Sequence, residues 1–273
     1  MTQFKYRAPL ARAELLDLIA QHEAVRILAG GTDLLVDVRN GFARPEVVVD
    51  IKRVDGLRDI KMRPSDAALV IGAAATINDV LRSEAIREGY PLLAACAEDL
   101  ASYQIRNRAT VVGNIVNASP CSDMAPGLLC LQANVVVSSQ RGERVVPLHQ
   151  FFTGVKKTVL EHDEVLERIV VPAQNAGARG GYRKLKRIKG HDLGIVGVAL
   201  FELDGCLRVG ISSAAPTPVL VDGLSTDMPA DEIVAAARAA ISPISDVRCS
   251  AEYRAFMVET YVRRLLNELV EVA

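Results

Sequence analysis

The sequence contains no tryptophan, and aromatic residues make up only 4 % of its 273 positions. Aliphatic side chains must therefore supply most of the packing, and an apolar content of 50 % is enough to bury the cores of about two domains. No apolar run approaches the roughly 20 residues that a membrane helix requires. The start, MTQFKYRAPL, lacks the apolar core and cleavage site of a signal peptide. We therefore expect a cytoplasmic protein without a membrane span.

Neither sign of charge predominates, since 32 basic and 33 acidic residues give a formal net charge of −1. Nucleic acids and anionic membranes bind basic surfaces, so this balance favours neither as a partner. The five cysteines are odd in number, scattered, and form no CxxC pair, which is typical of reduced thiols. Cys121 and Cys130 are the best candidates for metal ligands, but they have no partner pair, and we expect no metal site.

Motifs of hydrolytic enzymes are also missing from the sequence. It contains no GxSxG and no HExxH, and its four histidines lie far apart, without a metal-ligand residue at helical spacing. We therefore expect neither a nucleophilic triad nor a zinc-dependent hydrolytic centre.

Apolar periodicity and turn residues indicate an α+β chain. Helices are expected at residues 11–22, 32–41, 76–84, 91–100, 124–131, 231–241 and 251–272. Strands are expected at residues 25–28, 46–52, 69–75, 134–139, 144–147, 165–171, 182–188, 194–203 and 207–213. Residues 102–122 are less regular and rich in polar side chains.

A change of composition divides the chain. Residues 173–181, AQNAGARGG, are small, polar and rich in glycine, which is typical of a linker. We expect a mixed domain at residues 1–172 and a smaller domain at residues 182–273, with a three-stranded antiparallel sheet and helices. The Asp204–Gly205 turn supports a hairpin within that sheet.

The first candidate site is the segment RILAGGTD at residues 26–33, where a strand runs through two glycines into the start of a helix. Glycines allow close backbone approach, and free N–H groups at such a point bind phosphate oxygens without a basic side chain. An ordinary strand–turn–helix corner would give the same pattern. The segment is not GxGxxG, so it does not indicate a Rossmann-type NAD site.

The second candidate site lies at residues 106–123, where polar side chains cluster around Gly113. They are Thr110, Asn114, Asn117, Ser119 and Asp123. Because buried polar groups need partners, this density suggests a ligand with many hydroxyl and phosphate oxygens. The alternative is a polar loop whose side chains bond to their own backbone.

The third candidate is the basic run YRKLKRIKGHD at residues 182–192. In a strand, Tyr182, Lys184 and Lys186 share one face, and a cation there would stabilise negative charge on a flavin or a phosphate. An edge strand guarded by lysines has the same pattern, and the run taken alone favours that interpretation.

Three segments, in this order, resemble one known family: AGGTDLL at 29–35, QIRNRATVVGNIVNASPCSD at 104–123 and YRKLKRIKGHDLGIV at 182–196. Together they are similar to the FAD-binding subunit of the xanthine dehydrogenase and carbon monoxide dehydrogenase family. The resemblance covers nearly the whole chain and includes FFTGVKKTVLEHDEVLERIVVP and SPISDVRCSAEYRAFMV. It implies an FAD-binding domain of the vanillyl-alcohol oxidase type, with subdomains at about 1–54 and 55–172, followed by the family's own C-terminal domain.

The resemblance also implies site residues. The FAD diphosphate would be held by two loops, one at Leu28 to Asp33 and one that contains Thr110, Gly113 and Asn114. Side chains of Asn117 and Asp123 would contact the cofactor, as would the backbone of Leu166. Lys184 would lie near the isoalloxazine. The full set is Leu28, Ala29, Gly30, Gly31, Thr32, Asp33, Thr110, Gly113, Asn114, Asn117, Asp123, Leu166 and Lys184.

The sequence departs from the family pattern at three points. Val112 stands where T-x-G-G-N has its first glycine, which predicts a less close backbone approach and a slight shift of that loop. Leu100 stands where some relatives stack an aromatic ring on adenine. The cysteine-rich insertion that holds an iron–sulfur cluster in the 4-hydroxybenzoyl-CoA reductases is missing, so we expect no cluster in this chain.

By resemblance the protein is the FAD subunit of an oxidoreductase, a molybdenum hydroxylase. It would pass electrons from the two [2Fe–2S] clusters of a small subunit to NAD or another acceptor, beside a large subunit with the molybdenum cofactor, in a dimer of heterotrimers. No residue is expected to act as a nucleophile. One alternative is a free-standing flavin-dependent reductase or oxidase with its own substrate pocket, and another is a scaffold that keeps the fold without FAD.

Overall fold

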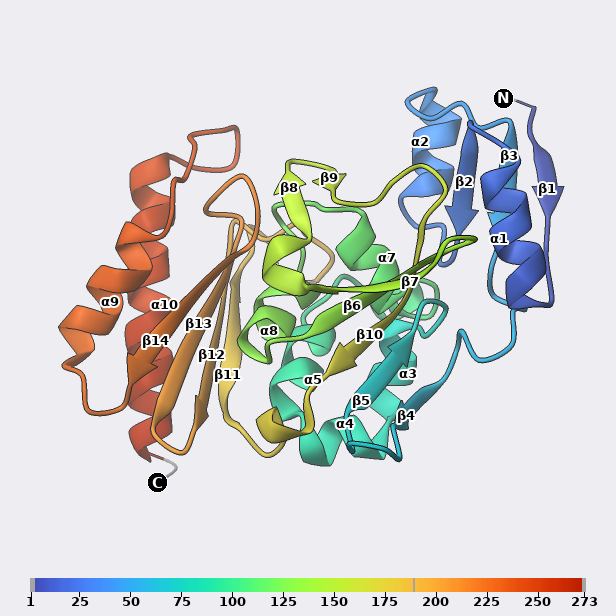
Figure 1. Ribbon diagram of the computed structural model, residues 1–273. Helices are drawn as coiled ribbons and strands as arrows, with labels where there is room; N and C mark the ends of the chain where they lie inside the picture. The colour runs from blue at the N-terminus through green and yellow to red at the C-terminus, as the bar shows by residue number, and fades with distance from the viewer. Residues whose placement is uncertain (1–2, 189, 272–273) are drawn as a thin grey trace.

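The computed structural model describes residues 3–188 and 190–271. Figure 1 shows three groups of strands in a row, with the N-terminal group at one end and the C-terminal group at the other. The central group, together with its helices, lies between the N-terminal and C-terminal groups. Within the described residues, none of the helices is both long and apolar enough to cross a membrane.

The N-terminal group is a small parallel sheet in the order β1-β3-β2. Its elements are β1 (Lys5–Arg7), α1 (Arg12–Ala20), β2 (Val25–Leu28), α2 (Leu34–Asn40) and β3 (Val47–Asp50). All four residues of β3 are buried, as expected for a central strand. Helix α1 buries Leu15, Leu16 and Ile19, which confirms the predicted apolar face.

The central group is a five-stranded antiparallel sheet in the order β4-β5-β10-β6-β7. Its strands are β4 (Ile60–Met62), β5 (Leu69–Gly72), β6 (Asn134–Ser139), β7 (Gly142–Pro147) and β10 (Val165–Val171). Its helices are α3 (Ile77–Arg82), α4 (Glu84–Gly89), α5 (Pro91–Glu98), α6 (Tyr103–Arg106), α7 (Val111–Val116) and α8 (Met124–Cys130). The connections contain η1 (Leu148–Gln150), the hairpin β8 (Phe152–Gly154) and β9 (Lys157–Thr158), and η2 (Ala173–Asn175).

Residues 102–122, which looked irregular in the sequence, contain the short helices α6 and α7. Each begins after a hydroxyl residue whose side chain accepts a hydrogen bond from the first turn. Ser102 accepts from the Ile105 N–H, and Thr110 accepts from the Gly113 N–H. Helices of four and six residues are too short to show apolar periodicity, so only these caps could have indicated them.

The C-terminal group is a four-stranded antiparallel sheet in the order β11-β12-β13-β14, where the sequence predicted three strands. Its strands are β11 (Arg179–Leu185), β12 (Val196–Leu203), β13 (Cys206–Ser212) and β14 (Val219–Ser225). The missed strand, β14, lies at the edge, contains Gly223, and is only partly buried. These features remove the alternation by which a strand is predicted.

The predicted linker at 173–181 is partly wrong, because β11 begins at Arg179. Gly180 is the reason for the error. A methyl group on this residue would lie 1.9 Å from the Leu200 carbonyl oxygen, so the glycine reflects close contact between strands.

Both faces of the C-terminal sheet are covered. Val198 and Leu200 belong to the core shared with α9 (Ala230–Ala239) and α10 (Ala251–Glu271), whereas Ala199 and Phe201 belong to the core of the central group. Helix α8 approaches β13 so closely that a methyl group on Gly210 would lie 2.2 Å from the Pro126 carbonyl oxygen. This packing brings β11 to the start of α8, where the third candidate segment meets the second.

Candidate functional site

The first loop joins β2 to α2 and presents a row of backbone donors. The N–H groups of Gly30, Gly31, Thr32 and Asp33 have no hydrogen-bond acceptor within the described part of the chain. Gly31 has a φ of +76°, which turns the chain between strand and helix. Consecutive free N–H groups of this kind suit a ligand with phosphate oxygens.

The second loop is built around the start of α7. The Thr110 hydroxyl accepts from the Gly113 N–H at 2.9 Å, and a methyl group on Gly113 would lie 2.8 Å from that hydroxyl oxygen. Val112 is only 4 % exposed and packs in the core, so its side chain does not occupy the open side of the loop. Asn114 accepts from the Ser122 hydroxyl at 2.6 Å and from the Met124 N–H at 3.2 Å, which ties α7 to the start of α8.

The two loops touch. A methyl group on Gly30 would lie 2.2 Å from the Arg108 carbonyl oxygen and 2.9 Å from the Ala109 Cα, so only glycine permits this approach. Further along, the Asn117 amide donates to the Asp33 carboxylate at 3.2 Å. Asp33 does not cap α2 with its side chain but is held by the second loop. The free N–H groups of the first loop therefore lie at a junction of both.

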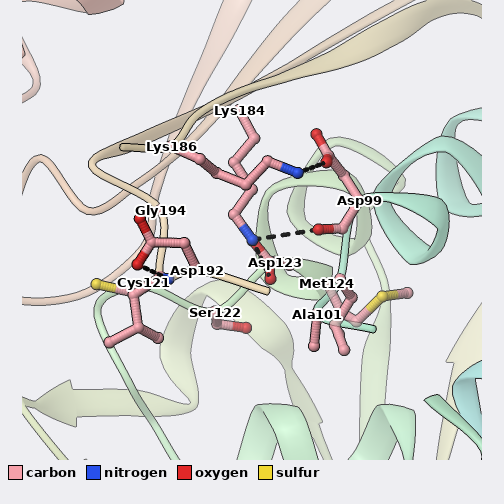
Figure 2. Close-up of polar contacts among 12 residues, drawn as sticks. Asp99, Ala101, Cys121, Ser122, Asp123, Met124, Lys184, Lys186, Asp192 and Gly194 are labelled. Atoms are coloured by element: carbon pink, nitrogen blue, oxygen red, sulfur yellow. Dashed lines mark hydrogen bonds and ion pairs between the residues drawn. The ribbon is translucent and has the colours of Figure 1, made fainter. Parts of the chain in front are cut away.

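A buried cluster lies where β11 meets the start of α8 (Figure 2). Lys184 Nζ donates to Asp123 Oδ2 at 2.8 Å and to the Asp99 carbonyl oxygen at 3.2 Å, and its side chain is 1 % exposed. The Tyr182 hydroxyl donates to Asp123 Oδ1 at 3.1 Å. Lys186 reaches the Asp99 carboxylate at 2.5 Å, so the predicted common face of Tyr182, Lys184 and Lys186 is confirmed.

Burial sets the electrostatics of this cluster. It raises the pKa of Asp123, although the charge and hydrogen bond of Lys184 act in the opposite direction. Burial, with the negative charge of Asp123, raises the pKa of Tyr182 well above its ordinary value, so this phenol stays protonated and donates. An enclosed ion pair is costly to desolvate, and here the cost is offset by the hydrogen bonds that Tyr182 and the Asp99 carbonyl add to the pair.

The other predicted residues occupy supporting positions. The Leu28 carbonyl accepts from the Ile51 N–H at 3.1 Å, and the Ala29 carbonyl accepts from Lys52 Nζ at 3.3 Å. Leu166 is 1 % exposed in β10, which packs beside α7, so only its backbone could face a ligand. The structure thus unites residues 28–33 with 110–117, and Asp123 with Lys184, while Asn114 links these two groups.

Two residues of the site were missed in the sequence. Asp99 holds both Lys184 and Lys186, and Lys156 donates to Asn117 Oδ1 at 2.6 Å. Both act across long sequence separations, and no local motif indicates them. Within the described residues, no group of three or more histidine, cysteine or acidic side chains is placed to hold a metal ion.

The chain is similar to known FAD-binding proteins. Residues 2–174 match the family described as the FAD binding domain in molybdopterin dehydrogenase. The chain is 34 % identical to the carbon monoxide dehydrogenase medium chain of Hydrogenophaga pseudoflava, over 97 % of this chain and 96 % of that one. It is 31 % identical to a putative xanthine dehydrogenase FAD-binding subunit of Escherichia coli, over 98 % and 96 % of the two chains.

A solved structure supports the same assignment across both parts of the chain. The carbon monoxide dehydrogenase of Hydrogenophaga pseudoflava, in a form that lacks the Mo-pyranopterin moiety of its cofactor, superposes with a TM-score of 0.89 at 34 % identity. The superposition covers 97 % of this chain and 96 % of that chain. The chain therefore belongs to the FAD-binding subunits of the xanthine dehydrogenase and carbon monoxide dehydrogenase family of oxidoreductases, and its cofactor is FAD.

Proposed function

We propose that this chain is the electron-transfer subunit of a multi-subunit molybdenum hydroxylase. In this role it takes electrons from iron–sulfur clusters of a partner subunit and passes them to NAD or another acceptor. FAD supplies the redox chemistry when bound, and the chain supplies binding, orientation and electrostatics. The relatives support this proposal, because their names describe a medium chain and an FAD-binding subunit.

One observation carries the proposal: four consecutive free N–H groups lie where two glycine-containing loops touch. The linked phosphates of a dinucleotide need many donors and close backbone approach, and this junction offers both. The residues present therefore fit FAD. We assign the diphosphate to Leu28–Asp33 with Thr110, Gly113 and Asn114, and further cofactor contacts to Asn117, Asp123 and the Leu166 backbone.

Lys184 has a separate role in the proposal. It is a buried cation that Asp123 and Asp99 hold in one position. We place it beside the isoalloxazine, where a positive charge would stabilise electrons on the ring. In this role the chain needs no acid–base pair to abstract a proton from a substrate. A free-standing reductase or oxidase with its own substrate pocket would need one.

The partners follow from the same role. We propose a large subunit with the molybdenum cofactor and a small subunit with [2Fe–2S] clusters, assembled as a dimer of heterotrimers. The cytoplasmic location and the division into domains at 1–172 and 182–273 remain predictions.

The test is purification of the tagged full chain from its natural host under mild conditions. We expect yellow protein with about one FAD per chain, accompanied by two further subunits, molybdenum and iron. A single-chain flavoprotein free of molybdenum and iron would instead support a free-standing reductase or oxidase. Colourless protein that stays colourless after incubation with FAD would overturn the proposal.

A further inference from the structure

The hairpin β8–β9 reaches the second loop through the residue at its tip. The Lys156 N–H donates to the Ala118 carbonyl at 2.9 Å, and Lys156 Nζ donates to Asn117 Oδ1 at 2.6 Å. In Figure 1 the hairpin lies above α7, separate from the five-stranded sheet. Lys156 is thus anchored by backbone and side chain at the same point.

The contact continues to the first loop. Asn117 accepts from Lys156 through its carbonyl oxygen and donates through its amide nitrogen to Asp33 Oδ1 at 3.2 Å. Three elements distant in sequence are joined in one chain of hydrogen bonds. The lysine fixes the orientation of the Asn117 amide, because a cation can only donate to the carbonyl oxygen.

This series of hydrogen bonds reduces a repulsion between negative charges. The Asp33 carboxylate lies on the loop whose free N–H groups suit an anion, and a negative charge there opposes a second one. Asn117 satisfies the carboxylate without changing its charge. Lys156, at the other end of this series of hydrogen bonds, is a cation and offsets the negative charge of Asp33.

The backbone of Lys156 gives an independent argument. Its φ is +58°, in the left-handed region that side chains other than glycine rarely adopt. The two-residue turn between β8 and β9 would suit glycine at this position. A lysine held in this conformation at a contact between loops indicates a role for its side chain.

We propose that Lys156 is a positioning residue for the FAD diphosphate. It orients Asn117 and offsets the charge of Asp33, so that the two loops accept a dianionic group between them. The inference rests on the proposed function, because it names a further residue of the same cofactor site.

The test measures the dissociation constant of FAD with the apo form of the full chain, at low and at high salt. Lys156→Gln should weaken binding about three- to tenfold at low salt, the range expected for one charge and one hydrogen bond. The difference should shrink at high salt, since exposed charges are screened. Lys156→Arg should bind like wild type, and so should Lys157→Gln, the matched control on the next residue of the hairpin.

A second variant separates charge from structure. Asp33→Asn in the Lys156→Gln background should restore FAD affinity to within about twofold of wild type, because no charge is left to offset. Equal affinity of Lys156→Gln and Lys157→Gln would overturn the inference, and so would failure of Asp33→Asn to rescue. If wild-type protein binds no FAD at either salt concentration, the proposed function falls as well.

Discussion

Gly30 lies at a close contact between the two loops of the proposed cofactor site, and its substitution tests that site directly. Gly30→Ala places a methyl group 2.2 Å from the Arg108 carbonyl oxygen, so the loops must separate. We expect FAD affinity to fall by more than about tenfold, since misplaced donors lose their hydrogen bonds. Equilibrium titration with FAD measures the change.

Gly89→Ala is the control for that variant, because it ends α4 and a methyl group there meets nothing within 4 Å. It should bind FAD like wild type. Wild-type affinity in Gly30→Ala would show that the contact between the loops is irrelevant to the cofactor.

Lys184 is the second residue with a measurable consequence. Lys184→Met removes the buried cation, so electrons on the isoalloxazine lose stabilisation and the reduction potential of the bound flavin should fall. We expect a fall of about 30 mV or more, which corresponds to about tenfold in a two-electron equilibrium. Lys186→Met, which removes the neighbouring cation on Asp99, should change the potential less. An unchanged potential in Lys184→Met would refute a role near the ring.

Among single residues, those of the two loops could be proposed from the sequence, whereas the distant residues that contact the site could not. Gly30, Gly31, Thr110 and Gly113 stand in short local patterns whose chemistry is visible without a fold. Asp99 and Lys156 act across 87 and 39 residues, and nothing beside them in the chain marks them. Their roles arise only from the packing of β11 on α5 and from the contact of the hairpin with Asn117 and Ala118.

Among the elements, β7 and the turn before β10 are joined by a bidentate ion pair. Arg144 donates to both carboxylate oxygens of Glu164, at 2.7 and 2.6 Å, and this bonding lowers the pKa of Glu164. A lowered pKa stabilises the fold above the unfolded-state pKa, and that contribution is lost as the pH falls through the folded-state pKa.

The free energy of unfolding should therefore decrease as the pH falls below about 4.5. In Glu164→Gln this decrease should be smaller, although the variant is less stable at neutral pH. Urea unfolding of both proteins between neutral and acid pH measures the two slopes. Parallel slopes would mean that other carboxylates govern the acid transition.

Long apolar runs made most of the elements predictable. The strands β3, β6 and β12 contain uninterrupted runs of buried residues, and β10 is buried except at Arg168. Helix α10 is long enough to show its amphipathic period. The short helices α4, α6 and α7 could not be found by periodicity. The edge strand β14 was missed because its side chains are only partly buried.

For the molecule as a whole, the close packing of β13 against α8 connects the C-terminal sheet to the central group. Gly210→Ala would force a methyl group against the Pro126 carbonyl, at 2.2 Å. We expect a loss of about 1–3 kcal/mol in the free energy of unfolding, as for other overpacked sites. Chemical denaturation of this variant and of Gly89→Ala would measure the loss. Equal midpoints would show that the contact between β13 and α8 adjusts to the methyl group at little cost.

The pair formed by Asp123 and Lys184 also has a consequence for biosynthesis. The two residues are 61 positions apart, and β11 follows the whole central group in the chain. A ribosome therefore releases the aspartate long before the lysine, and the carboxylate stays hydrated until the last sheet forms. In the proposed site, the end of the FAD pocket that contains Lys184 is therefore complete only after β11 has been synthesised and has packed against the start of α8.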